Sequence, residues 1–178
     1  MTHRVRVYPH NDLSNLAHYQ RETINKKIAE SNEDGIDLDC LSCLISLAFS
    51  VEALLNFVGY KKVKNWKERQ PYRDKMVQVC KAVGLQFSQE VDPYKTLWEL
   101  KELRDSIAHG QPIEVSAKVR NREELRKAME CPWDKNLNAE YINQTYKIVV
   151  QFEKDLLEKG KISLGETLTS AVSAGYET

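Results

Sequence analysis

Apolar residues recur at helical spacing along most of the chain. The positions Leu13, Leu16, Ala17, Ile24 and Ile28 predict an amphipathic helix over residues 13–29. The same reading predicts helices at 40–58, 71–83 and 94–109, and a last long helix that starts near residue 138. The stretch 111–137 is mixed, with an extended piece expected at 113–119 and a short helix at 122–129. Because no segment sustains a period of two, we expect an all-α helical bundle of four to five helices.

The segment from Cys40 to Val58 is apolar on nearly every side. Its nineteen residues are long enough to suggest a membrane span, but Glu52 and Asn56 lie inside it. A carboxylate near the middle of a membrane costs at least ~2.5 kcal/mol. The segment is therefore predicted to be the central buried helix of the bundle, and no membrane partner is expected.

The chain has 178 residues, which fits one domain over 1–160 followed by a flexible tail at 161–178. The 26 Lys and Arg residues balance the 26 Asp and Glu residues, so any binding to nucleic acid must come from a local patch. The first residues lack the apolar stretch of a secretory signal, and we expect a cytoplasmic protein. Most of the four cysteines lie in apolar helical runs, so a disulfide framework is not expected.

The end of the helix at 94–109 carries the most informative residues. Asp105 and His109 are one turn apart, so the carboxylate could orient the imidazole as a tuned acid or base. Arg104 supplies a planar cation suited to phosphate. Arg104 and His109 differ by ~7.5 Å of rise and ~140° of rotation, which suits one phosphate poorly on a single helix, and a two-fold dimer could gather both residues into one cleft. The alternative is that His109 only caps the helix before Gly110.

The six residues from Arg104 to His109 resemble the mark of the HEPN superfamily, in which an Arg and a polar residue precede a His at a helix end. The stretch from Ser50 to Asn56 is similar to the second helix of many HEPN proteins. A second match, from Arg4 to His10, lies before the first predicted helix and contains Pro9. The layout resemblance covers residues 12–158. Asp105 departs from the Asn that is more usual in the family.

The resemblance implies a homodimer with a composite cleft and, in many members, metal-independent RNA cleavage without a cofactor. His109 would be the general acid or base, Arg104 would stabilise the charged phosphate, and Asp105 would orient His109. Glu52 and Asn56 could be supporting polar groups behind that cleft, or simply a buried hydrogen-bonded pair. The alternative function is a non-catalytic helical module that binds another protein, such as an antitoxin or a nucleotidyltransferase.

A basic segment follows the central helix and supplies local positive charge for RNA. Its cations are Lys61, Lys62, Lys64, Lys67, Arg69 and Arg73, with Lys75 beyond them. Tyr60, Trp66 and Tyr72 are interleaved and could stack on bases. The alternative is a solvated linker. Cys40 and Cys43 have the spacing of zinc ligands, but no second pair completes a site, so no metal is predicted.

Overall fold

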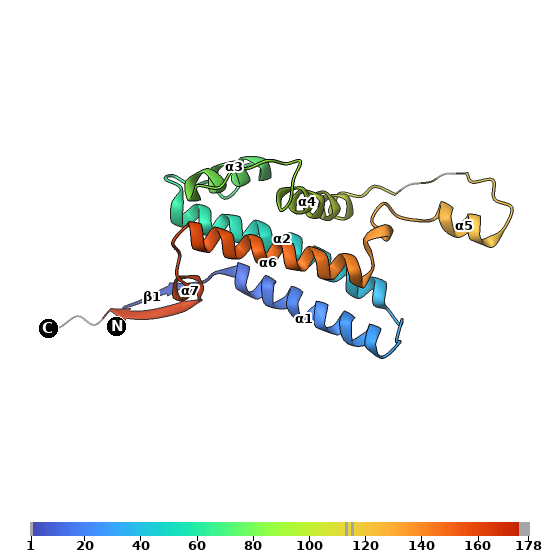
Figure 1. Ribbon diagram of the computed structural model, residues 1–178, viewed down its shortest axis with the longest axis horizontal. Helices are drawn as coiled ribbons and strands as arrows, with labels where there is room; N and C mark the ends of the chain where they lie inside the picture. Colours follow the sequence, from blue (N-terminus) through green and yellow to red (C-terminus); the bar gives the residue numbers. More distant parts are fainter. Residues whose placement is uncertain (1, 113, 115, 175–178) are drawn as a thin grey trace.

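The structure is a computed structural model that describes residues 2–112, 114 and 116–174 (Figure 1). Its elements in chain order are β1 (Thr2–Arg6), α1 (Pro9–Ala29), α2 (Ile36–Lys62), α3 (Tyr72–Val83), α4 (Tyr94–Ala108), α5 (Arg122–Ala128), the 3-10 helix η1 (Asp134–Asn136), α6 (Ala139–Lys159), α7 (Leu164–Thr167) and β2 (Ser170–Ala174). Helices dominate, which confirms the predicted all-α class and the helical bundle.

The central helix α2 forms the core of this bundle. Helices α1, α3, α4 and α6 all pack on it, and α6 lies along it in Figure 1. Among the described residues, α2 is the one helix whose length and composition would allow it to cross a membrane. Its most apolar stretch of 18 residues has a mean hydropathy of 1.9. Within the bundle, 61% of that apolar stretch is buried. Its apolar character is therefore used in packing against the neighbouring helices.

Helix α2 extends beyond both predicted ends. We expected it to stop at Gly59, but it continues to Lys62. The reason lies in Trp66, whose indole ring occupies the space that a Cβ atom on residue 59 would need. Gly59 therefore permits a close approach between the helix and the following loop, and it does not end the helix.

The remaining helix predictions agree with the structure to within a few residues. Helix α1 begins earlier than predicted, at Pro9. Helix α3 ends at Gly84, which adopts a left-handed conformation with φ of 79°. Asn138 caps α6 by accepting a hydrogen bond from the Tyr141 amide. Part of the extended piece expected at 113–119 lies outside the described residues.

The two ends of the chain form structure that the sequence did not predict. Strand β1 pairs antiparallel with β2, with Thr2 opposite Ala174 and Arg6 opposite Ser170. Helix α7 precedes β2 and begins with a capping box between Ser163 and Glu166. The expectation of a flexible tail from residue 161 therefore needs correction, because the chain up to Ala174 includes α7 and β2. Pairing between segments so far apart leaves no local periodicity to detect.

Candidate functional site

Five charged side chains from three helices form one connected network. Glu52 on α2 accepts hydrogen bonds from Lys75 Nζ on α3, at 2.6 Å, and from Arg104 Nη1 on α4. Asp105 Oδ1 accepts from Arg104 Nε and Nη2 at 2.9 and 2.7 Å. Lys101 Nζ lies 2.9 Å from Asp105 Oδ2. We call Glu52, Lys75, Lys101, Arg104 and Asp105 the Glu52–Arg104 cluster.

The cluster keeps its two carboxylates charged although they are partly withdrawn from water. Burial raises the pKa of Glu52, but hydrogen bonds from Lys75 and Arg104 outweigh it and leave the pKa below its usual value. Burial likewise raises the pKa of Asp105, and hydrogen bonds from Lys101 and Arg104 bring it below normal. Three cations face two carboxylates, so the cluster has a net charge of +1.

Two carboxylates hold the Arg104 guanidinium in place, but some of its N–H donors remain free of them. Among the described residues, three of its N–H groups bind the two carboxylates. A guanidinium has five such donors, so one remains on each Nη. The side chain is 15% exposed, and its Cζ lies 5.5 Å from the centre of the Phe49 ring. Arg104 can therefore offer two hydrogen bonds to an anion without leaving its carboxylate partners.

His109 lies at the end of α4 and is exposed to solvent. It is the first residue after the helix, and its backbone N–H donates to Asp105 O at 2.9 Å. The Asp105 carboxylate binds Arg104 and Lys101, so the expectation that it orients His109 needs correction. Side chains on a helix incline toward its N-terminus, which directs Asp105 back to Lys101 and away from His109.

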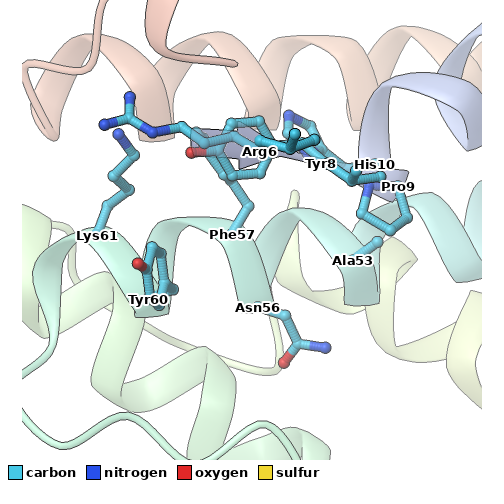
Figure 2. Close-up of a pocket in the computed structure, with 11 residues that line it drawn as sticks. Arg6, Tyr8, Pro9, His10, Ala53, Asn56, Phe57, Tyr60 and Lys61 are labelled. Carbon is cyan, nitrogen blue, oxygen red and sulfur yellow. The ribbon is translucent and has the colours of Figure 1, made fainter. Parts of the chain in front are cut away.

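Glu52 and Asn56 have different surroundings, although they are one turn apart. Glu52 contacts Arg104 directly, as its proposed supporting role requires. Asn56 is half-buried, and its Oδ1 has no hydrogen-bond partner among the described residues. Figure 2 shows the Asn56 side chain pointing away from the chain segment that carries Arg6 and Tyr8. No described contact joins Asn56 to the cluster.

The basic segment divides into exposed and engaged cations. The exposed ones are Lys62, Lys64, Lys67, Arg69 and Arg73. Lys61 is half-buried and lies 3.2 Å from Glu166, and Lys75 belongs to the Glu52–Arg104 cluster. Stacking on bases is open to Tyr60, which is exposed.

Trp66 and Tyr72 pack against the bundle, Trp66 half-buried and Tyr72 buried. Trp66 packs against Gly59, and the buried Tyr72 hydroxyl donates to Leu97 O at 3.3 Å. The expectation that three interleaved rings could stack on bases therefore does not hold for the buried Tyr72. Their rings fill the space between helices, where apolar area gains most from burial.

Lys75 and Lys101 were missed as site residues. Lys75 stands among the buried positions of α3, between Tyr72 and Val79, and is only 2% exposed. A lysine on the apolar face of a short helix was the available signal, because a buried ammonium requires a carboxylate partner. Lys101 precedes Asp105 by one turn, a spacing that favours an ion pair.

One face of α2 carries apolar residues that no described element fully covers. Leu38 is 71% exposed and Phe49 is 44% exposed. Leu41 and Ile45 lie between them and are half-buried. At ~100° per residue these four residues lie on one stripe of the helix, and Glu52 lies on the same stripe. We call this the α2 stripe, and the contact between Phe49 and Arg104 places it beside the Glu52–Arg104 cluster.

Comparisons of the chain with protein-family models, with curated proteins and with solved structures gave no match. The HEPN resemblance therefore rests on the residues of this chain alone, from Arg104 to His109 and from Ser50 to Asn56.

Proposed function

We propose that the protein is a metal-independent endoribonuclease of toxin or defence type with a HEPN-like fold. The observation that carries the proposal is the state of Arg104. Carboxylates from α2 and α4 hold its guanidinium, it retains two N–H donors, and the exposed His109 follows at the end of the same helix. Anion-binding donors and a titratable imidazole are the groups that phosphodiester transfer requires.

The reaction follows from the chemistry of these two residues. His109 accepts the proton of a ribose 2′-hydroxyl, and the oxygen attacks the adjacent phosphorus atom. The bond to the 5′-oxygen breaks, and that oxygen takes a proton from an imidazolium. The products are a 2′,3′-cyclic phosphate and a 5′-hydroxyl. Arg104 donates to the non-bridging oxygens as negative charge develops on them.

A second copy of the chain completes this site in the proposal. One helix separates Arg104 and His109 by ~140°, which suits contact with one phosphate only if two copies of α4 share a cleft. The α2 stripe is the face that fits such pairing, since it is apolar, exposed and adjacent to Arg104. Pairing α2 with its copy brings both Glu52–Arg104 clusters near the two-fold axis.

The exposed part of the basic segment supplies attraction for RNA. These cations run from Lys62, the last residue of α2, through Lys64, Lys67 and Arg69 in the following loop to Arg73 in α3. Cations in this position attract phosphates without sequence preference, and Tyr60 at the end of α2 can stack on a base. We assign the segment to substrate capture and the α4 end to chemistry.

The experiment is incubation of the purified protein with a 5′-labelled RNA in EDTA. The proposal predicts fragments that end in 2′,3′-cyclic phosphate, because no step uses a metal. Cleavage that disappears with EDTA and returns with magnesium would contradict the mechanism.

A second candidate is the non-catalytic module that binds an antitoxin or nucleotidyltransferase. One observation favours it, because Asp105 binds Lys101 and Arg104, and its carboxylate therefore does not orient His109. This candidate predicts a folded dimer that leaves RNA intact in both EDTA and magnesium. Because both candidates are dimers, light scattering only confirms the assembly of the sample, and the presence or absence of RNA cleavage by that sample separates the two functions.

A further inference from the structure

A groove runs between the amino-terminal segment and the C-terminal half of α2 (Figure 2). One wall consists of the consecutive residues 5–10, and the other comes from α2 between Ala53 and Lys61. Its volume is about 760 Å³, within the range of ligand-binding clefts. Neither Arg104 nor His109 lines the groove, so the proposed cleavage chemistry does not account for it.

The first wall includes a strand with an unpaired edge. Among the described residues, β1 pairs only with β2. Tyr8 N–H donates to Thr169 Oγ1, just before β2, at 3.2 Å. Backbone groups alternate in direction along an extended chain, so the N–H of Val7 points away from β2. A two-stranded ribbon is marginally stable by itself, and a third strand along this edge would stabilise it.

Two cations lie at one end of the groove. Figure 2 shows Arg6 from β1 and Lys61 from α2 extending toward the same end. Arg6 makes no ion pair with a described residue, whereas Lys61 Nζ pairs with Glu166 at 3.2 Å and would have to exchange that partner. The groove therefore favours an anionic occupant.

We propose that this groove binds an extended acidic peptide of a partner protein as a third strand beside β1. Main-chain hydrogen bonds to the β1 edge supply affinity, and alternate side chains supply specificity. Acidic side chains of the peptide pair with Arg6 and Lys61. The intervening apolar side chains contact exposed Val7 and Tyr60, both of which line the groove. This inference requires no RNA cleavage and goes beyond the proposed function.

Charge and geometry favour the acidic peptide over two other occupants. A second copy of β1 contains arginine and no carboxylate, so it would bring positive charge against Arg6, and like charges destabilise cross-strand pairing. RNA matches the positive charge but lacks the alternating amide donors and acceptors that a strand edge pairs with. An acidic peptide meets both requirements at once.

The test uses the full chain and a fluorescein-labelled peptide with the sequence Glu-Val-Glu-Val-Glu-Val. Fluorescence anisotropy should show saturable binding. The peptide Lys-Val-Lys-Val-Lys-Val should bind at least tenfold more weakly. An acidic peptide with N-methyl groups on alternate residues should also lose at least tenfold in affinity, because it lacks the main-chain donors.

Two matched variants locate the binding. Arg6→Gln should lower the affinity for the acidic peptide at least fivefold. Lys26→Gln, at an exposed lysine near the far end of α1, should leave that affinity unchanged. Hydrogen exchange of the Val7 amide should slow on binding. Equal affinity for the acidic and basic peptides, or no saturable binding, would overturn the inference. If Arg6→Gln weakens only RNA binding, the groove belongs to RNA and the inference is also wrong.

Discussion

Glu52 on α2 and His10 on α1, which stacks on α2, are two polar side chains that differ in charge state. Glu52 pairs with Lys75 and Arg104 and remains ionised. His10 is 2% exposed and stacks on Phe57 at 4.4 Å between ring centres. Neither of its ring nitrogens has a partner among the described residues, and burial lowers its pKa to about 4. Of these two groups, the one that retains its charge is the one with counter-charges beside it.

The difference between Glu52 and His10 raises the question of why the bundle keeps the Glu52–Arg104 cluster charged. Withdrawing ions from water costs several kcal/mol each, and well-packed apolar residues often stabilise a core at least as well as a buried ion pair. A helical bundle therefore does not need such a cluster for stability. Its contacts with Arg104, on the helix that ends before His109, are consistent with a role in holding Arg104 for an anionic substrate.

Removing Glu52 should have the largest effect on stability. Glu52→Ala leaves Lys75 buried without its carboxylate, and loss of one partner of a buried pair costs about 3–5 kcal/mol. Urea denaturation followed by circular dichroism measures the change in the free energy of unfolding.

The double variant Glu52→Ala/Lys75→Met is the matched control for that loss. It removes the stranded ammonium, so it should be clearly more stable than Glu52→Ala alone. A single variant that loses less than about 1 kcal/mol, the range of an exposed pair, would show that the cluster behaves as a surface contact.

The second prediction concerns the pH dependence of stability that His10 introduces. Its pKa falls from 6.5 when unfolded to about 4 when folded, so the unfolded chain binds the proton more tightly. Stability is complete above pH 6.5 and declines as the pH falls toward 4, by about 3 kcal/mol in all. In His10→Phe this decline should be absent between pH 6.5 and 5. Urea midpoints measured across that range give the slope, and an unchanged slope would contradict the buried neutral state.

The third prediction concerns the exposed cations of the basic segment, whose replacement should have the smallest effect on folding stability. Replacing Lys62, Lys64, Lys67 and Arg69 with Ser should change stability by no more than about 0.5 kcal/mol per site, because these side chains are exposed. The variant should bind RNA more weakly and with a shallower dependence on salt, since fewer counterions are released. Filter binding at about 50 to 200 mM salt measures how RNA affinity depends on salt. An unaltered slope of affinity against salt would make the segment a solvated linker.

The helices could be predicted from the sequence because their signals are local. Apolar periodicity, the Gly84 stop and the Asn138 cap depend on residues a few positions apart. Pairing between β1 and β2 joins opposite ends of the chain and leaves no such trace. The α7 capping box was readable at Ser163 and Glu166, but the polar composition of the tail obscured it.

The candidate site was only partly predictable for a related reason. Arg104, Glu52 and His109 were identified from residue type and spacing, but the contact between Arg104 and Glu52 depends on how α4 packs against α2. The assignment of Asp105 to His109 failed because angular spacing ignores the inclination of helical side chains. Because helical side chains incline toward the N-terminus of the helix, Asp105 pairs with Lys101, which lies one turn earlier.

The most direct measurement of the central claim is RNA cleavage by His109→Ala in EDTA, with light scattering and circular dichroism on the same sample. A histidine at a helix end contributes at most about 1–2 kcal/mol to stability, so the variant should remain folded and dimeric. Its cleavage rate should fall at least about 100-fold, because general acid–base catalysis contributes that much or more. Cleavage at the wild-type rate by a folded His109→Ala dimer would contradict the account and leave His109 as a helix cap.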